Sequence, residues 1–440
     1  MKDQVSQVFL RTNLVSGHLR LVTSFAEESA KVFNLGVAEA LKMALACEEI
    51  FTYLCQAGRT DEMITIEAIN GGYYAELRLL FKATNFNPRA FNLTASVSAE
   101  TLDNKLDLRE MGLLIASRIV DRFFITGSLQ QDLELILVKE KSYPDLTELE
   151  VPKISQIKKF SFRTPDPESL KLFVRLVRAH CPSHLYLPAF NFPGKIVDMV
   201  ASNEYGAGVA VGDHGEIGGG IVWHWIGNRL VEFFGPYQFG QPGNPELAMG
   251  LVDFCLGRIA KTDAISLISR YPVSELPQGY FESLGSIDFI QPDGSSKPRP
   301  IYYRQLQEDL GCPVWAHPLL EEFLRREYRR LFFAREIRLT RHEGEKRPPG
   351  SVFAPQFDRT KGEITLKPIW DGEDVSANLA QHIKVLKAEN LPNIFFEIDL
   401  AHPWQANLTP SLFENNFRPQ LILPYGGEAD VVVFQHQEGR

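Results

Sequence analysis

The pattern of hydrophobic and polar residues divides the chain into three stretches of alternating helices and strands. In the first stretch, apolar residues recur with the spacing of a helix and then with the two-residue alternation of a half-buried strand. An Asn-Gly pair at 70–71 separates two alternating runs, which predicts a β-hairpin. The predicted elements are a strand over 18–25, helices over 26–36 and 42–58, the hairpin over 63–81, a helix over 108–124 and a strand over 132–139.

The second stretch runs from about 158 to 308. A glycine-rich turn joins two apolar runs of a long hairpin, and a loop rich in glycine and proline leads from a strand into a helix. Pro167 suits the first turn of the helix that precedes the hairpin. The predicted elements are a strand over 158–165, a helix over 166–181, the hairpin over 205–226, a strand over 228–235, a helix over 246–260, a strand over 264–270, a short helix over 277–285 and a hairpin around 292–298.

The third stretch, 352–437, has the order β-α-β-α-β-β, which repeats the second half of the stretch before it. A helix over 317–339 precedes it, with acidic residues first and arginines last, as the helix dipole favours. We therefore predict an α/β (α+β) protein. Its predicted parts are a domain over 1–140, a linker over 141–157, a domain over 158–316, a bridging helix and linker over 317–350 and a partial domain over 351–440.

Composition excludes several classes of function. The net charge of −9 argues against a general nucleic-acid binder, which needs a basic face. The five cysteines form no CxxC motif, so neither a zinc knuckle nor a disulfide framework is expected, and no metal site is predicted. The N-terminus lacks the apolar core of a signal peptide, and no apolar run is long enough to cross a membrane. These features predict a cytoplasmic protein.

The helix over 42–58 carries acidic residues in an otherwise apolar sequence. Glu49 is followed one turn later by Tyr53. Together with the order of elements over 18–139, this helix resembles the GHKL (Bergerat) ATPase fold, and most closely the small anti-sigma-factor kinases. The resemblance implies an α/β sandwich with an ATP site, in which an acid orients the attacking group and an asparagine four residues later holds Mg²⁺. Here Glu49 stands at the acid position and Tyr53 at the asparagine position.

The other residues that such an ATP site needs are largely replaced. A phenol such as that of Tyr53 is a poor ligand for Mg²⁺ at neutral pH. Residues 82–91 lack the aspartate and glycines of the adenine-binding loop, and Gly112 alone remains of the glycine turn that contacts phosphate. The resemblance therefore implies a vestigial regulatory domain that does not hydrolyse ATP, with ATP not expected as a ligand. Its former nucleotide site would comprise Glu49, Tyr53 and Gly112.

The strand over 228–235 and the loop after it carry a second resemblance, to the GNAT N-acyltransferase fold. In that fold the fourth strand splays away from its neighbour to receive pantetheine. The next loop and the N-terminus of the following helix bind the pyrophosphate of CoA. The domain over 158–316 is similar to this fold over its whole length, and 351–440 to its C-terminal half. The resemblance implies an acyl-CoA ligand bound by Phe234, Gly235, Gln238, Gly240 and Gly243.

Two residues are candidates for acid–base chemistry. The tyrosine that protonates the leaving thiolate in the GNAT fold aligns with Phe281, so the neighbouring Tyr280 is the predicted acid. Glu232 is the candidate base on the splayed strand. These residues are predicted to act on an acceptor that the sequence does not identify.

Two functions remain open from the sequence. One is a GNAT-like, acyl-CoA-dependent N-acyltransferase or acyl-CoA-binding protein with a vestigial anti-sigma-kinase-like regulatory domain. The other is a non-catalytic bacterial regulatory protein that acts by protein–protein partner switching, with eroded ATP and CoA sites. The sequence identifies neither the regulated partner nor whether the chain pairs with a second copy.

Overall fold

The structure is a computed structural model, and it describes most of the chain. The described residues are all except 1–5, 83–85, 96–107, 128–131, 146–153, 155–156, 158, 241–242, 278, 292–293, 342–343, 390 and 438–440. Parts of the predicted linker over 141–157 and of the loop over 82–91 therefore lie outside the described residues. Within the described residues, no helix combines the length and the apolar character needed to cross a membrane.

The chain forms two compact units. Unit 1 comprises residues 1–143, 346–355 and 368–382, and unit 2 comprises residues 144–345, 356–367 and 383–440. Both units combine helices with sheets, which confirms the predicted α/β class.

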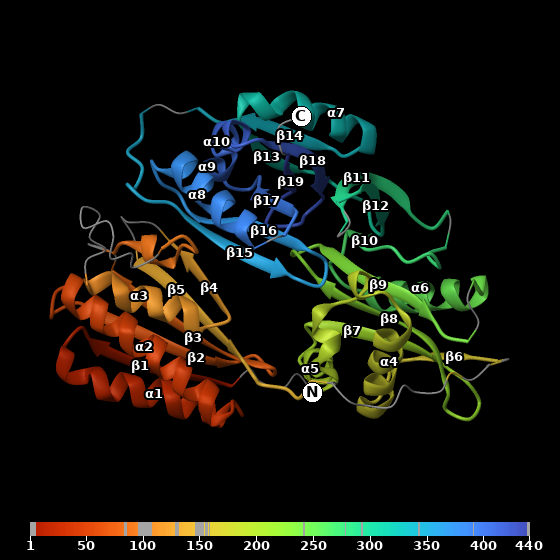
Figure 1. Cartoon of the computed structure of the whole chain (residues 1–440), viewed down its shortest axis with the longest axis horizontal. Coiled ribbons are helices and arrows are strands. Elements are labelled where there is room, and N and C mark those ends of the chain that lie inside the picture. Colours follow the sequence, from red (N-terminus) through yellow and green to blue (C-terminus); the bar gives the residue numbers. More distant parts are fainter. Residues whose placement is uncertain are drawn as a thin grey trace. The chain divides into compact units, whose positions relative to one another are not determined.

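Unit 1 contains an antiparallel sheet with helices on one face (Figure 1). Its strands alternate buried and accessible residues, so one face of the sheet builds the core. The strand order is β1-β2-β3-β5-β4. The elements are β1 (Gln7–Asn13), α1 (Leu19–Val32), α2 (Val37–Ala57), β2 (Met63–Asn70), β3 (Tyr74–Lys82), α3 (Leu108–Ile119), β4 (Arg122–Thr126) and β5 (Asp132–Glu140).

Two of the predicted elements in unit 1 are wrong. The strand expected over 18–25 is part of helix α1, because Val22, Ala26 and Ala30 recur every four residues and are buried together. The helix expected over 108–124 ends at Ile119, and the residues after it form strand β4 against β5. The hairpin over 63–81 and the strand over 132–139 are present as predicted.

The first part of unit 2 is a seven-stranded sheet with the order β11-β12-β10-β9-β8-β7-β6. Strands β9 and β10 run parallel, and the other neighbours run antiparallel. The elements are β6 (Ser161–Arg163), α4 (Pro167–His180), α5 (Pro193–Ala201), β7 (Tyr205–Val211), β8 (Ile217–Trp225), β9 (Leu230–Gln238), α6 (Pro245–Ile259), β10 (Ser266–Ser269), β11 (Glu282–Ile290) and β12 (Ser296–Gln305).

Helices α4 and α6 cover opposite faces of this sheet. A Cβ atom on Gly220 would meet the ring of Phe173 on α4, and one on Gly219 would lie 3.2 Å from Leu251 on α6. Because successive residues of a strand point to opposite faces, the two helices sandwich β8. The glycines of the sequence GGG therefore allow close packing on both sides.

The second part of unit 2 is built around the sheet β15-β16-β17-β19-β18. Its β-α-β-α-β-β order over 363–436 is the predicted one. Strand β15 and helix α8 also supply residues to unit 1. The elements are β15 (Val352–Asp358), β16 (Glu363–Trp370), α8 (Val375–Ala388), β17 (Asn393–Asp399), α9 (Pro403–Ala406), α10 (Thr409–Glu414), β18 (Phe417–Leu423) and β19 (Val431–His436).

The helix predicted over 317–339 is shorter than expected. Helix α7 (Pro318–Leu331) ends at Phe332, which has a left-handed backbone with φ of 56°. The remaining residues form β14 (Arg335–Leu339), which pairs in parallel with β13 (Cys312–Ala316). The arginine-rich helical pattern did not show this change to a strand.

A buried ionic network anchors β14 to the end of the chain. The Arg335 guanidinium is fully buried and donates to both oxygens of Asp430, at 2.8 and 3.2 Å, and to Asp309 at 2.8 Å. It also lies 4.7 Å from the ring centre of Tyr425. Burial opposes its charge, but Asp430 raises the pKa of Arg335 above its ordinary value, so the arginine stays charged. Removing one partner leaves a buried charge without compensation.

We expect Asp430→Asn to lower the free energy of unfolding by about 3–5 kcal/mol, because it leaves Arg335 buried with one carboxylate fewer. Urea unfolding followed by circular dichroism measures this change. Glu336→Gln on the same strand is the control, since Glu336 pairs with Arg338 at the surface. An Asp430→Asn protein as stable as the control would contradict the assignment.

Candidate functional site

The central feature of unit 2 is the point where two parallel strands separate. Strands β9 and β10 pair only from Leu230 to Glu232 on β9. Beyond this point β9 continues to Gln238, whereas β10 ends at Ser269. One edge of β9 therefore has no strand partner after Glu232, and ligands of open α/β sheets commonly bind at such places.

Glu232 stands at the separation point and is held by ion pairs. Its side chain is 1% exposed. Arg270 donates to both of its oxygens at 2.7 Å, and His224 Nε2 lies 3.1 Å away. Burial alone would raise the pKa of Glu232, but Arg270 and His224 hold that pKa well below its ordinary value. A carboxylate with both oxygens engaged and a lowered pKa is poorly suited to act as a general base at neutral pH.

The ion pair of Glu232 is part of a longer series of alternating charges. Arg270 Nη1 lies 3.7 Å from Glu397 on β17, and Lys367 on β16 lies 3.1 Å from the same carboxylate. Burial opposes ionisation of Glu397, yet Lys367 and Arg270 keep its pKa below its ordinary value. The series therefore joins the seven-stranded sheet to the five-stranded sheet of unit 2.

Aromatic side chains bridge the gap beside β9. Phe233 stacks on Phe281 with ring centres 5.2 Å apart, and Phe234 stacks on Tyr271 at 6.0 Å. Phe281 and Tyr271 belong to the segment that follows β10. Side chains of the protein itself thus lie along the edge of β9 where the sequence predicted a ligand. Phe234, a predicted ligand contact, is buried in this packing.

Tyr280 lies in a turn before β11 rather than on a helix. The helix predicted over 277–285 is wrong, because Leu284, Ile287 and Phe289 alternate inward along β11 with one bulge. The Tyr280 hydroxyl lies 3.5 Å from Asp253 on α6, and the Arg304 guanidinium lies over its ring. Tyr280 and Glu232 are each engaged with other partners, Asp253 and Arg270.

The loop between β9 and α6 is closed by its own side chains. The Gln238 amide accepts from the Asn244 N–H at 2.9 Å and donates to the Asn244 carbonyl at 2.8 Å. Asn244 in turn caps α6 by accepting from the N–H of Leu247. Gly240 and Gly243 have left-handed φ values of 71° and 77°, and Gly235 has a φ of 102°. Two donors at the start of α6 are therefore already satisfied, and Pro245 supplies none.

In unit 1, the structure brings Glu49, Tyr53 and Gly112 together between α2 and α3. A Cβ atom on Gly112 would lie 2.5 Å from the Glu49 carboxylate. Burial, and then the charge of Glu48, raise the pKa of Glu49. The Tyr53 hydroxyl accepts from the N–H of Asn87 at 3.0 Å, and its ring meets Phe86 edge-on. Tyr53 is 5% exposed and belongs to the core of unit 1.

A segment distant in sequence covers this region of unit 1. The Asn92 amide donates to the Ser351 carbonyl at 2.8 Å and accepts from the Phe353 N–H at 3.1 Å. The Asn378 amide donates to the same Ser351 carbonyl at 3.0 Å. No motif in the sequence linked residues near 90 to residues near 350 and 378. The sequence assigned the latter only to a separate domain.

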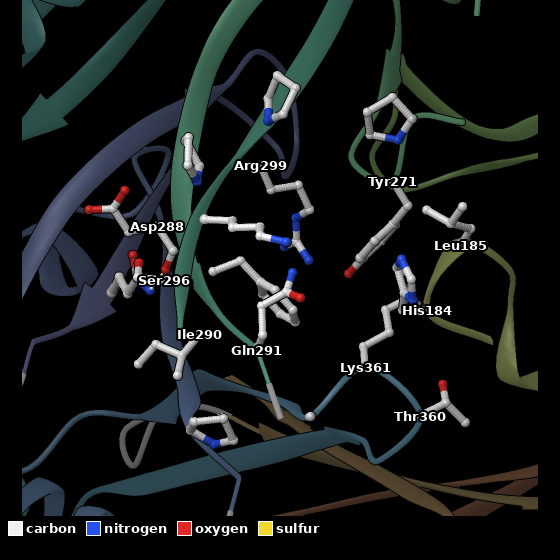
Figure 2. A pocket seen from close by; sticks show the side chains of 18 of the residues that line it. His184, Leu185, Tyr271, Asp288, Ile290, Gln291, Ser296, Arg299, Thr360 and Lys361 are labelled. Atoms are coloured by element: carbon white, nitrogen blue, oxygen red, sulfur yellow. Dashed lines mark hydrogen bonds between the residues drawn. The ribbon is translucent and has the colours of Figure 1, made fainter. Parts of the chain in front are cut away.

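The described part of unit 2 contains a cleft of about 1880 Å³. Its lining comes from residues that are distant in sequence, which is why sequence patterns did not reveal it. Figure 2 shows Arg299 and Tyr271 pointing toward each other, with His184 and Lys361 beside Tyr271. The lining includes residues 183–185, 271–274, 288–291, 296–300, 359–362, 391–392 and 435–437. Within the described residues, no cluster of three or more histidine, cysteine or acidic side chains could hold a metal ion.

Comparisons with known proteins return solved structures of GNAT acetyltransferases. An aminoglycoside 6'-acetyltransferase type Ii is 16% identical, with 34% of this chain and 98% of that chain covered and a TM-score of 0.28. A GNAT superfamily phosphinothricin acetyltransferase from Sinorhizobium meliloti, in complex with AcCoA, is 17% identical, with 34% and 89% covered and a TM-score of 0.29. The GNAT family N-acetyltransferase YhbS from Escherichia coli, in complex with CoA, is 12% identical, with 37% and 87% covered and a TM-score of 0.25.

These matches concern about a third of this chain. With TM-scores well below 0.5, they leave its ligand and activity open. No protein-family model matches the chain, and comparison with curated proteins returns no significant match.

The lowered pKa of Glu232 makes stability depend on pH. Its ionisation stabilises the fold above its ordinary pKa of 4.5, and this contribution is lost as the pH falls below that value. At neutral pH, Glu232→Gln should cost about 3–5 kcal/mol, because Arg270 loses its buried partner. As the pH falls toward about 3, wild type should lose stability faster than the variant, so that the difference narrows.

Chemical denaturation at several pH values measures this difference. Glu168→Gln is the control, since Glu168 forms an exposed pair with Lys171. A difference between wild type and Glu232→Gln that stays constant down to low pH would show that the pKa of Glu232 is not lowered in the folded protein.

Proposed function

We propose that the protein binds acyl-CoA through a GNAT-like domain over 158–316, which is followed by a second, partial GNAT-like domain over 351–440. The observation that supports this proposal most directly is the separation of the parallel strands β9 and β10 after Glu232. A glycine-containing loop and the N-terminus of α6 follow β9 directly. A strand edge and a helix N-terminus in this order suit a long ligand with a phosphate at one end.

The loop after β9 offers a phosphate room to approach. Apart from its chain neighbours, no described residue lies within 4 Å of a Cβ atom built on Gly243. The helix dipole of α6 favours an anion nearby, although Glu246 in its first turn opposes one. Gln238 contributes by holding the shape of the loop, and Gly240 and Gly243 provide its left-handed turns.

Binding without efficient transfer is the activity that this arrangement supports best. Glu232 is fixed by Arg270 and His224, and Tyr280 faces Asp253. A CoA thiolate, with a pKa near that of cysteine at about 8.5, can leave without much help. General acid–base assistance is nevertheless worth roughly 10²–10⁴-fold in rate, and neither predicted residue is placed to provide it.

Unit 1 supports a second candidate function, a regulatory role through a protein partner. We propose that unit 1 is a vestigial GHKL-like domain that works without nucleotide. Tyr53 packs in the core, at the position where the resemblance places a magnesium ligand. The edge strand β1 exposes Val8 and Phe9, which could contact a partner protein or a second copy of the chain.

Acyl-CoA at about 100 times its Kd should add about 2.7 kcal/mol of apparent stability to the full chain. Gly243→Val should abolish the thermal shift, since a β-branched residue strains a left-handed backbone. Gly257→Ala on α6 is the control, because Gly257 lies in open space with an ordinary helical backbone. A wild-type protein without any shift, or a shift that survives Gly243→Val, would overturn the proposed site.

The same samples test catalysis through release of free thiol from acyl-CoA in the presence of amine acceptors. We expect no turnover, and we expect Tyr280→Phe to leave acyl-CoA affinity nearly unchanged. Acyl transfer by wild type that Tyr280→Phe slows by roughly 10²–10⁴-fold would show instead that Tyr280 is a general acid.

For unit 1 we expect no Mg²⁺-dependent ATP hydrolysis by the full chain above the level of a Glu49→Ala variant. The reason is that a buried phenol replaces a magnesium-binding side chain. Release of phosphate from ATP, measured with and without Mg²⁺, tests this expectation. Turnover that depends on Glu49 would establish an active nucleotide site.

A further inference from the structure

Most of the charged residues that line the cleft of about 1880 Å³ in unit 2 are cations. It is larger than the roughly 300–1,000 Å³ of a typical small-molecule pocket, so it has room for an extended ligand. Among the described lining residues, Asp288 is the one carboxylate. This excess of positive charge contrasts with the net charge of −9 of the chain. The lining cations are Lys297, Arg299, Arg359, Lys361, Lys387 and Arg418.

Arg299 is held in a fixed position in this cleft. Its guanidinium lies 4.7 Å from the ring centres of both Tyr271 and Phe289. One terminal nitrogen pairs with Glu363. Its Nε is buried and has no hydrogen-bond partner within the described residues. A buried donor without a partner is costly, so this N–H is suited to a ligand or to water.

In Figure 2, Lys361 and His184 lie on the side of Tyr271 away from Arg299. The Lys361 ammonium is 4.4 Å from the ring centre of Tyr271 and pairs with Asp358. Burial, and then the charges of Arg299 and Lys361, lower the pKa of His184, which keeps its imidazole neutral at neutral pH. Figure 2 shows His184 next to Tyr271 and Lys361 on one side of the view. The positive charge here therefore comes from Arg299 and Lys361.

Two further cations have no carboxylate partner within the described part of the chain. Lys297 is exposed on β12. Arg418 donates only to the backbone carbonyls of Phe413 and Phe417. These cations come from β12 and β18, which belong to different sheets. Such a distribution favours a ligand with more than one anionic group.

Gln435 adds a polar atom that also lacks a partner. Its amide nitrogen donates to the Asp288 carbonyl at 2.6 Å, whereas its Oε1 is buried without a hydrogen bond within the described residues. The side chain is 4% exposed and belongs to the lining. A ligand hydroxyl or amine could satisfy this acceptor. The cleft thus offers a donor at Arg299 and an acceptor at Gln435 that the protein itself does not use.

We propose that this cleft binds a phosphorylated small molecule. Arg299 and Lys361 attract its anionic groups from the two sides of Tyr271, and Lys297 and Arg418 add further positive charge. A phosphate suits this set because its oxygens accept hydrogen bonds from a guanidinium fork and an ammonium together. The proposal does not rest on the acyl-CoA site at the β9–α6 loop. The phosphate could belong to the 3'-phosphoadenosine end of CoA or to an unrelated phosphorylated compound.

Isothermal titration of the full chain with pyrophosphate tests the proposal. Charged hydrogen bonds contribute about 1.5–3 kcal/mol, so Arg299→Gln should weaken binding by roughly 10–100-fold. Arg299 also pairs with Glu363, so that variant is tested for folding by circular dichroism. The double variant Lys297→Glu with Arg418→Glu removes no carboxylate pair, and we expect it to weaken binding by at least about tenfold.

Two controls separate this site from others. Lys384→Glu changes an exposed charge on α8 outside the cleft lining, and we expect it to leave pyrophosphate binding unchanged. Gly243→Val tests the acyl-CoA loop and should also leave pyrophosphate binding unchanged. A failure of acyl-CoA binding would therefore leave the proposal for the phosphate cleft standing, and a failure of pyrophosphate binding would leave the proposal for the acyl-CoA site standing.

Adenosine 3',5'-bisphosphate distinguishes the two sources of phosphate. Binding tighter than that of pyrophosphate, and weakened by the cleft double variant, supports the phosphate end of CoA as the ligand. If adenosine 3',5'-bisphosphate binds more weakly than pyrophosphate and the cleft double variant weakens its binding further, another phosphorylated compound is the ligand. The proposal is overturned if pyrophosphate does not bind wild type, if the double variant binds it as tightly as Lys384→Glu does, or if citrate binds as tightly as pyrophosphate.

Discussion

The ion pair between Glu232 and Arg270 is the constraint on which the arrangement of unit 2 depends. It lies where β9 and β10 stop pairing, and its strength keeps a carboxylate charged in the core. A charge at this depth must be paired, so Arg270 cannot leave without a large penalty. The segment after β10 therefore stays close to β9, and Phe281 and Tyr271 can stack along its edge. The same pair that stabilises the fold keeps the predicted base from acting as one.

The seven-stranded sheet and the five-stranded sheet of unit 2 both place charged residues where two parallel strands stop pairing. In the second sheet, β16 and β17 pair in parallel from Glu363 to Leu366, and the next residue on each strand joins the Lys367–Glu397 ion pair. Each sheet thus has a parallel pair with charges where the pairing ends. Arg270 contacts both carboxylates, Glu232 and Glu397, so the charged residues of these two sheets form one connected series of ion pairs.

The order of elements could be predicted from the sequence, but most of the site could not. The alternation of apolar and polar residues predicted the hairpin over 63–81 and the β-α-β-α-β-β order near the C-terminus. Both could be predicted because they depend on residues that are close in the sequence. The prediction of a helix at Tyr280 was wrong because the residues after it form β11, which pairs with β12. A local sequence pattern does not reveal such a pairing. Glu232 was predicted as the base because its strand resembles the fourth strand of the GNAT fold, and this role stays a prediction. Its partner Arg270 was missed, because it ends a separate strand. The cleft was missed for the same reason, since its cations come from segments as distant in the sequence as Lys297 and Arg418.

Residues 346–355 and 368–382 belong to unit 1, although they follow most of unit 2 in the sequence. This order has a consequence for biosynthesis. Val352 and Trp370 belong to the core of unit 1, and Asn92 bonds to Ser351 and Phe353. About 200 residues separate the end of the first segment at 143 from residue 346. At translation rates of about 5–20 residues per second, roughly 10–40 seconds pass between the two. During that time the amino-terminal core lacks Val352 and Trp370, so the apolar surface that they cover stays exposed on the nascent chain.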